Sequence, residues 1–361
     1  MKLKSIINTA AVICVIAIIA AGIIGFNVKG KISAAENRKL ASFPDKNPFH
    51  ESFPKQMDTY INDRIGMREP AVKAYGYIAD YLPVNLTGNT AIEGENGWLF
   101  LNQESDTYCY YQRTSPFSEK SVQKILGIIN ANVKFCEEHG IKLVLIIPPN
   151  KSTVYPEYYP KYIKHLDKPV PYETLVQRIK TSADLPLVAP LNVLLSGKKE
   201  QELYFRKDSH WNTFGSYAAY RILAEEIRKI YPDFYILQDK DMEDCEVEPM
   251  RDLSLMLKLP YGDEPKEKGL CPPYQTNLAL KNEPGIKRSD YAAGGDERGP
   301  KILLIHDSFM TALHPYLERS ASEIASLWVY QYDFEKMKDI ILENKPDIII
   351  WEVLERYFAM Q

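Results

Sequence analysis

Short apolar runs alternate with amphipathic stretches through most of the chain, and this alternation predicts its fold. The apolar runs, each indicating a strand, are residues 142–147, a short stretch within 187–195, 302–305, 327–330 and 347–351. The amphipathic stretches, each with helical spacing, are residues 118–139, 171–181, 213–230 after a cap at Asn212 or Thr213, and 333–343. Strands that alternate with helices form parallel sheets covered on both faces, so we expect a three-layer α/β fold with a mostly parallel sheet of about five strands.

The first apolar stretch of the chain has a different character. Residues 6–26 are uncharged, mostly apolar and long enough to cross a bilayer as a helix. Lys2 and Lys4 precede this run and favour a cytoplasmic N-terminus, so we predict a transmembrane signal-anchor over residues 1–27. The alternatives are a signal peptide cleaved near residues 33–35 and a buried soluble helix. With an anchor or a signal peptide, the rest of the chain is exported.

After this segment we expect a linker with N-terminal helices over residues 28–93 and a main domain over 94–361. Three prolines make residues 36–54 an extended linker, and residues 53–81 have the spacing of one or two amphipathic helices. The main domain begins at 94–101 with a glycine-bearing turn and an aromatic strand, a hairpin-like pattern.

Residues 239–300 interrupt the alternation of strands and helices. They are charged, rich in proline and glycine, and show little periodicity, which predicts a long insertion or lid. Cys245 and Cys271 could close a loop here by a disulfide, although the sequence cannot establish the pairing. The chain has five cysteines and no CxxC pair, which argues against a structural zinc site.

Composition and charge narrow the classes of function. The net charge of −4 over 361 residues gives no electrostatic footprint for nucleic acid, so we expect no nucleic-acid partner. The 24 tyrosines and four tryptophans suit sugar faces, and they suit an ordinary core equally well.

Two polar segments offer candidate chemistry. Ser308 follows a buried strand, at the position where open α/β sheets place their ligands. Asp208 and His210 are two residues apart, so in an extended segment both side chains point to one side. An aspartate can then orient the imidazole, and the histidine can act as base for a serine nucleophile. We therefore predict that the two segments meet.

Each of these residues also has a plainer interpretation. Asp208 could be a turn residue and His210 a satisfied core histidine, while Asp307 and Ser308 suit a helix N-cap. Asp208, His210, His306 and Asp307 could also hold a metal ion, although their spacing matches no standard zinc motif, and we expect no metal and no cofactor. The acidic and basic positions after the last strand, Glu352, Glu355 and Arg356, could line the same edge of the sheet, but we interpret them as a solvated rim.

The segment Asp208-Ser-His-Trp-Asn212, followed by His306-Asp-Ser-Phe309, resembles the DHHW-type branch of the SGNH-hydrolase superfamily, which includes periplasmic alginate O-acetyltransferases. Residues 36–44, 97–100 and 251–256 look similar too, so the resemblance covers most of the chain beyond the anchor. It implies an SGNH-like fold.

The resemblance also implies roles for individual residues. Ser308 would be the nucleophile, His210 its base and Asp208 the orienting acid. His306 departs from the pattern, which has glycine there, so a side chain could crowd the nucleophile or alter access. Further candidates for substrate or oxyanion contacts are Asn150, Asp307, His306 and Trp211.

The function implied by the resemblance is O-acetylation of a cell-surface or secreted polysaccharide, outside the cytoplasm and through an acyl-enzyme. The acetyl donor would be a membrane acyltransferase of the MBOAT class. Two alternatives are an acetylesterase with the same triad and a non-catalytic polysaccharide-binding or assembly protein.

Overall fold

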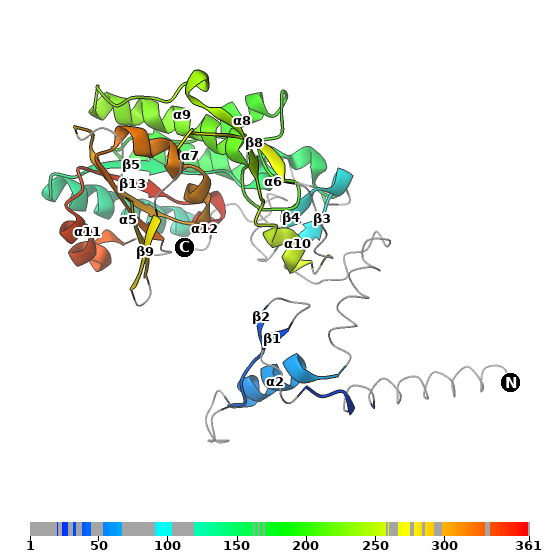
Figure 1. Cartoon of the computed structure of the whole chain (residues 1–361). Helices are drawn as coiled ribbons and strands as arrows, with labels where there is room; N and C mark the ends of the chain where they lie inside the picture. Colours follow the sequence, from blue (N-terminus) through cyan, green and yellow to red (C-terminus); the bar gives the residue numbers. More distant parts are fainter. Residues whose placement is uncertain are drawn as a thin grey trace, which may run out of the picture. The chain divides into compact units, whose positions relative to one another are not determined.

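A computed structural model of the chain describes part of its length (Figure 1). The described residues are 20, 24–27, 32–33, 38–44, 53–66, 91–102, 119–161, 163–164, 167–168, 170–257, 259, 266–274, 278–283, 286–291, 298–328 and 333–359. The chain forms two compact units, one of Met1–Gly88 with Ser254–Asp263, and one of Asn89–Leu253 with Glu264–Gln361. The second unit contains the candidate chemistry.

A seven-stranded sheet forms the centre of the second unit, in the order β6-β5-β13-β11-β12-β10-β9. Five of its strands are mutually parallel: β5 (Lys142–Ile146), β6 (Leu187–Val188), β11 (Lys301–His306), β12 (Glu323–Trp328) and β13 (Ile348–Glu352). Their interiors are almost wholly buried, because helices cover both faces and leave no room for polar positions. The predicted five-stranded parallel sheet is confirmed.

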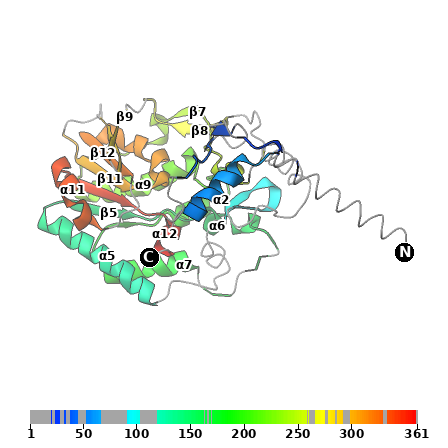
Figure 2. The same ribbon diagram turned by 90° about the horizontal axis from the view of Figure 1, so that it is seen from below.

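Helices lie on both faces of this sheet (Figure 2). Helices α5 (Glu119–Glu138) and α7 (Pro171–Ser182) lie side by side on one face, where Arg178 forms an ion pair with Glu119. Helix α9 (Thr213–Ile230) covers the other face, and the side chain of Asn212 caps it by accepting a hydrogen bond from the Gly215 N–H at 3.1 Å. The helices fall close to their predicted ranges because each has a clear apolar stripe.

Two predicted elements near the C-terminus differ from the structure. Strand β12 begins at Glu323, four residues before the predicted start at 327. Its first half reads Glu-Ile-Ala-Ser, and the small and polar residues there mask the apolar pattern. The predicted helix 333–343 is a 3-10 turn, η6 (Phe334–Met337), followed by α11 (Lys338–Asn344).

The insertion has more regular structure than its sequence suggests. It contains β7 (Glu243–Val247), α10 (Asp252–Met256), β8 (Glu267–Cys271), β9 (Leu278–Glu283) and β10 (Ile286–Tyr291). Strands β9 and β10 form a hairpin that pairs antiparallel with β12 and extends the central sheet. Strands β7 and β8 also pair, and a disulfide joins Cys245 to Cys271.

The hairpin predicted at 94–101 is the antiparallel pair β3 (Ala91–Glu93) and β4 (Leu99–Leu101), joined by a turn in which Gly97 has φ +73°. In the first unit, helix α2 (Phe53–Arg64) corresponds to the start of the region predicted to be helical, residues 53–81. Residues 67–90 lie outside the described part. The predicted anchor at 1–27 lies largely outside it too. Among the described residues, no helix has both the length and the apolar character needed to span a bilayer.

Candidate active site

Ser308 lies directly after the carboxyl end of β11, at the start of the 3-10 helix η4 (Ser308–Ala312). Asp307 is the N-cap of this helix, and its Oδ1 accepts a hydrogen bond from the Phe309 N–H at 3.0 Å. The N-cap interpretation of Asp307 is therefore correct. It does not exclude a chemical role for Ser308, because the cap fixes the turn that presents the hydroxyl.

His210 lies on a short loop whose base is a β-bridge between Tyr204 and Trp211. The indole N–H of Trp211 donates to the Phe309 carbonyl at 3.0 Å, so the loop is joined directly to the turn that carries Ser308. Trp211 is fully buried. Trp211 therefore links the loop that carries His210 to the turn that carries Ser308.

Asp208, His210 and Ser308 form one chain of hydrogen bonds. The Asp208 Oδ1 lies 2.6 Å from the His210 Nδ1, and the His210 Nε2 lies 2.7 Å from the Ser308 Oγ. The same Oδ1 accepts the backbone N–H of His210 at 2.9 Å. A carboxylate beside Nδ1 keeps the proton on that nitrogen, which leaves Nε2 free to accept the Ser308 proton.

The electrostatics of Asp208 favour its charged form. Burial raises the pKa of the Asp208 carboxyl, but the hydrogen bond and the charge of His210 outweigh it, and the pKa lies below its usual range. Asp208 is 1 % exposed and His210 8 % exposed, so solvent screens their interaction little. An ionised carboxylate in this position can stabilise the imidazolium that forms when His210 takes a proton.

Two residues that support the His210 loop were not predicted as site residues. Lys151, at the start of α6 (Lys151–Val154), is 4 % exposed, and its ammonium donates to the carbonyls of Leu99, Arg206 and Asp208 at 2.7, 2.6 and 3.0 Å. On another side of the loop, Asp252 accepts two hydrogen bonds from Ser209. The only sequence signal for Asp252 is the family-like segment 251–256, and Lys151 has none.

The turn at Ser308 is supported from below by β13 and the residues after it. Glu352 Oε2 accepts the Asp307 N–H at 3.0 Å, and Asp307 Oδ2 accepts the Leu354 N–H at 3.1 Å. Burial, and next the charge of Asp307, raise the pKa of the Glu352 carboxyl well above its usual range, so this environment favours its neutral form.

The prediction of a solvated rim after β13 is therefore wrong for its two acidic members. Glu352 is 1 % exposed and Glu355 is fully buried. Glu355 accepts hydrogen bonds from the Asn150 backbone N–H and the Thr153 hydroxyl. Arg356 is half-buried. The two acids are hard to recognise as buried in sequence because their partners are remote along the chain, 45 residues away for Glu352 and 202 and 205 for Glu355.

His306 does not crowd the nucleophile. Its Nδ1 donates to the Asp307 carbonyl at 2.6 Å, and its Nε2 lies 2.5 Å from the Ser326 hydroxyl on the neighbouring strand β12. Burial lowers the pKa of His306, which agrees with a neutral ring that donates from one nitrogen and accepts at the other. The side chain in place of the family glycine is thus directed toward β12.

Asn150 is the N-cap residue of the short helix α6, after the carboxyl end of β5, although its side chain makes no capping hydrogen bond. It is 4 % exposed, and neither atom of its side-chain amide has a hydrogen-bond partner among the described residues. The amide lines a small pocket together with Phe100, Ser209 and Arg356. Unsatisfied buried amides are rare, so the Asn150 amide is an exception among buried polar groups.

The proposed metal ligands do not gather as a set. Among the described residues, the acidic and histidine groups whose ligand atoms lie within 4.8 Å of one another are Asp208, His210 and Asp252. His306 and Asp307 are not among them. Both ring nitrogens of His210 are engaged with Asp208 and Ser308, and both oxygens of Asp252 are engaged with Ser209.

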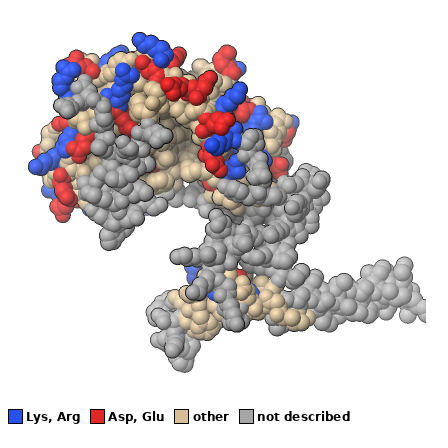
Figure 3. Space-filling view, in the orientation of Figure 1, with Lys and Arg blue, Asp and Glu red and all other residues tan. Residues whose placement is uncertain are grey.

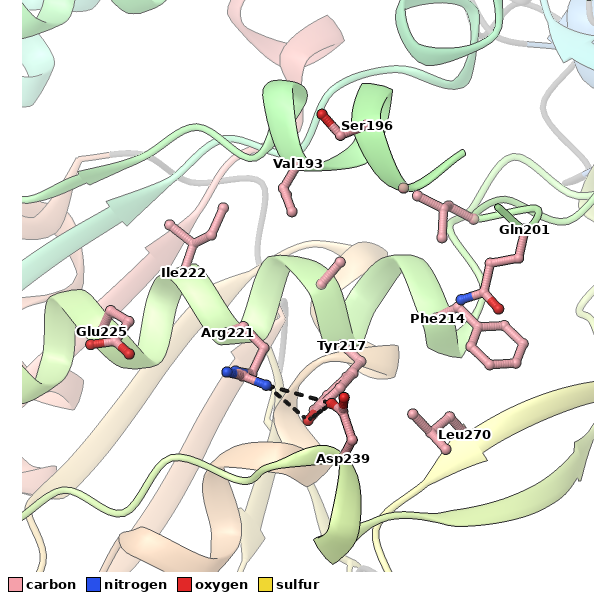
Figure 4. A pocket seen from close by; sticks show the side chains of 13 residues that line it. Val193, Ser196, Gln201, Phe214, Tyr217, Arg221, Ile222, Glu225, Asp239 and Leu270 are labelled. Atoms are coloured by element: carbon pink, nitrogen blue, oxygen red, sulfur yellow. Dashed lines mark hydrogen bonds and ion pairs between the residues drawn. The ribbon is translucent and has the colours of Figure 1, made fainter. Parts of the chain in front are cut away.

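A wider pocket of about 840 Å³ lies between α8 (Leu191–Gly197) and α9 (Figure 4). Its lining is largely apolar, with a polar group at one side where Arg221 and Tyr217 meet Asp239. None of the triad residues lines it.

On the described surface, basic and acidic side chains are interspersed on the face seen in Figure 3.

Comparison with known proteins gives several relatives of low identity. A probable alginate O-acetylase AlgJ of Pseudomonas aeruginosa is 24% identical over 287 residues, which cover 74% of this chain and 70% of the relative. The alginate biosynthesis protein AlgX of Pseudomonas fluorescens is 25% identical over 163 residues, 43% of this chain and 31% of the relative.

Solved structures support the same fold. The O-acetyltransferase domain of Pseudomonas putida AlgJ matches with a TM-score of 0.51 at 20% identity, covering 75% of this chain and 93% of that one. Bacillus cereus PatB1 matches with a TM-score of 0.54 at 14% identity, covering 74% and 97%. The family model described as SGNH hydrolase-like domain, acetyltransferase AlgX, matches residues 91–355. The chain therefore belongs to this family of SGNH hydrolase-like acetyltransferase domains.

Proposed function

We propose that this protein is an extracytoplasmic O-acetyltransferase that acetylates hydroxyl groups of a polysaccharide through Ser308, His210 and Asp208. The observation that carries the proposal is the continuous hydrogen-bonded chain from Asp208 through His210 to the Ser308 hydroxyl, with distances of 2.6 and 2.7 Å. This arrangement gives a weak nucleophile an adjacent base and gives the base an orienting acid. The family membership and the names of the relatives support acetyl transfer in a polysaccharide system.

The reaction takes two steps in this proposal. In the first, the Ser308 Oγ attacks the acetyl carbonyl of the donor as its proton passes to the His210 Nε2; the donor bond then breaks, and His210 returns the proton to the leaving oxygen. In the second, a sugar hydroxyl attacks the acetyl-enzyme and gives its proton to His210. The Ser308–acetyl bond breaks, and Ser308 recovers the proton.

Asn150 is our candidate for the side-chain donor of an oxyanion hole. Its amide is buried, lacks a partner among the described residues and follows a strand at the same edge of the sheet as Ser308. The Ser308 backbone N–H, at the start of η4, would be the second donor. Preorganised donors of this kind stabilise the charge that develops on the carbonyl oxygen.

The proposal includes a location and a partner. The acetyl donor would be a membrane acyltransferase of the MBOAT class, and residues 1–27 would anchor the chain beside it. The disulfide between Cys245 and Cys271 supports an oxidising compartment outside the cytoplasm. We propose no cofactor for the transfer.

The test is acetyl release from a chromogenic acetyl ester by the full-length chain in detergent. We expect Ser308→Ala and His210→Ala each to lower the rate at least about 1,000-fold, because nucleophile and base act as a unit. The matched control is Ser196→Ala, an exposed serine in the wider pocket, which should leave the rate unchanged. A wild-type chain without Ser308-dependent activity would contradict the proposal.

Acceptor oligosaccharides then separate transfer from hydrolysis. Mass spectrometry should show an added acetyl group on the oligosaccharide when the acetyl-enzyme forms in its presence. Acetate as the sole product across neutral and acidic oligosaccharides would identify an esterase instead.

A further inference from the structure

The loop that carries Asp208 and His210 makes few backbone hydrogen bonds of its own. The bridge at its base consists of two hydrogen bonds, from the Phe205 N–H to the His210 carbonyl at 3.2 Å and from the Asn212 N–H to the Leu203 carbonyl at 3.0 Å. The backbone groups between these residues form a turn and must find partners on other segments. Lys151 provides donors for two of the carbonyls, those of Arg206 and Asp208.

Asp252 provides the acceptors for another residue of the turn, Ser209. The Asp252 Oδ1 accepts the Ser209 N–H at 2.7 Å, and the Asp252 Oδ2 accepts the Ser209 hydroxyl at 2.5 Å. Hydrogen bonds to a carboxylate are stronger than those between neutral groups. We call this pair of hydrogen bonds the Asp252 clamp.

The Asp252 clamp binds the backbone between two members of the triad, Asp208 and His210. Ser209 is the residue between Asp208 and His210, so the direction of its N–H sets how both neighbouring side chains are presented. The Asp252 Oδ2 lies 3.9 Å from the His210 Nδ1, too far for a hydrogen bond, whereas Asp208 lies at 2.6 Å. Asp252 therefore leaves the imidazole to Asp208 and acts on the site through Ser209.

The position of Asp252 has an electrostatic cost. Burial, and next the charge of Asp208, raise the pKa of Asp252. A second carboxylate beside Asp208 is unfavourable for folding alone, so the contacts that it makes with Ser209 must offset the repulsion.

We infer that Asp252 is a positioning residue, whose two hydrogen bonds to Ser209 hold Asp208 and His210 in the geometry for proton transfer from Ser308. The inference rests on the proposed function, since it assigns Asp252 a part in the same site. Displacements of about 1 Å in a reacting pair cost about 100-fold in rate.

The experiment measures how fast a small sulfonyl fluoride, phenylmethylsulfonyl fluoride, modifies Ser308 in the full-length chain, by intact mass. In this reaction the Ser308 Oγ–S bond forms, the S–F bond breaks and fluoride leaves, while His210 accepts the Ser308 proton and passes it to water. The readout reports His210-assisted attack by Ser308 and needs neither acetyl donor nor sugar.

We expect Asp252→Ala to slow the modification about 10- to 100-fold at a temperature well below its melting point. Asp252→Asn should stay within about threefold of wild type, because its amide oxygen can accept the Ser209 N–H and its amide N–H can donate to the Ser209 hydroxyl. Ser209→Ala should cost about three- to tenfold in the wild-type chain and nothing more in the Asp252→Ala background. The control is Glu246→Gln, an exposed charge in the same disulfide-closed segment, with no change expected.

A wild-type rate in Asp252→Ala, or a rate in Asp252→Asn as low as in Asp252→Ala, would overturn the inference. If Asp252→Ala does not fold, Ser209→Ala and Asp252→Asn test the same contacts, and a wild-type rate in Ser209→Ala overturns it. A wild-type chain whose Ser308 is no more reactive than that of His210→Ala would instead show that the proposed function has failed.

Discussion

The two segments that meet at the candidate active site are held in place in different ways. The turn at Ser308 is supported by its neighbours in the sheet: Glu352 on β13 accepts the Asp307 N–H, and His306 bonds to Ser326 on β12. The loop at His210 is held by ionisable side chains from separate segments, Lys151 and Asp252, and burial lowers the pKa of Lys151 to about 7. The turn is held from within the sheet, whereas the loop depends on these two side chains from outside it.

This difference predicts where the site is sensitive to substitution. Sheet register is a collective property of many backbone hydrogen bonds, so one altered side chain disturbs it little. A buried charge with several hydrogen bonds has no substitute, and its loss leaves its partners without hydrogen bonds in a dry environment. We therefore expect the loop to be more fragile than the turn.

The largest effect should come from Lys151→Met. Its removal takes a donor from the carbonyls of Leu99, Arg206 and Asp208, of which the Arg206 carbonyl still accepts the Leu99 N–H at 2.9 Å. We expect the free energy of unfolding to fall by about 3–5 kcal/mol, measured by urea denaturation. The matched control is Lys161→Met, an exposed lysine paired with Glu95, which should change it by less than about 1 kcal/mol. Equal stability of the two variants would contradict the expectation that the His210 loop depends on Lys151.

A smaller effect, on the turn side, should appear in acid. Burial lowers the pKa of His314 to about 4, and the charge of nearby His306 acts in the same direction. An unfolded histidine takes up a proton near pH 6.5, so acid favours the unfolded chain. The free energy of unfolding should therefore fall by about 3 kcal/mol as the pH drops from 6.5 to 4.

The measurement is urea denaturation across this pH range in wild type and in His314→Gln. The glutamine variant, which does not titrate, should lose that part of the acid dependence. The carboxyl of Glu318 lies 3.8 Å from the His314 imidazole, so its titration is the other local contribution with which that of His314 must be compared. Parallel pH curves for the two proteins would show that His314 is not the group responsible.

The smallest effect should come from Glu352→Gln. Because the raised pKa of Glu352 favours a neutral carboxyl, we expect glutamine to replace it: the amide carbonyl can accept the Asp307 N–H, and the amide N–H can donate to the Asp307 carboxylate. We expect a change in the free energy of unfolding below about 1 kcal/mol at pH 7, measured by thermal denaturation. Glu352→Ala, which removes both contacts, is the comparison, and an equal loss in both variants would refute a neutral Glu352.

The sequence was most informative where local pattern and position agree. The apolar runs predicted the five parallel strands, and Ser308 after one of them marked the edge of the sheet where the polar groups gather. The pairing of Asp208 with His210 could be predicted because residues two apart in an extended segment face the same side. Their catalytic roles stay predictions until Ser308 and His210 are substituted.

The supporting residues could not be predicted because their partners are remote in sequence. Lys151 has the composition of a surface residue, and only the fold brings it against carbonyls 52 to 57 residues away. Glu355 contacts Asn150 from 205 residues away. The polar residue Ser326 hid the start of β12 because its hydroxyl is satisfied by His306, a contact that no local pattern reveals.

The disulfide between Cys245 and Cys271 has a consequence for when the site becomes complete. It closes a segment with a sequence separation of 26 that includes Asp252, seven positions after the first cysteine. Closing this loop restricts the conformations open to the segment that carries Asp252 in the unfolded chain. In a reducing compartment this restraint is absent, so it would be added to the chain by oxidation if the protein is exported as proposed. Oxidative folding would then also be a maturation step for the proposed enzyme.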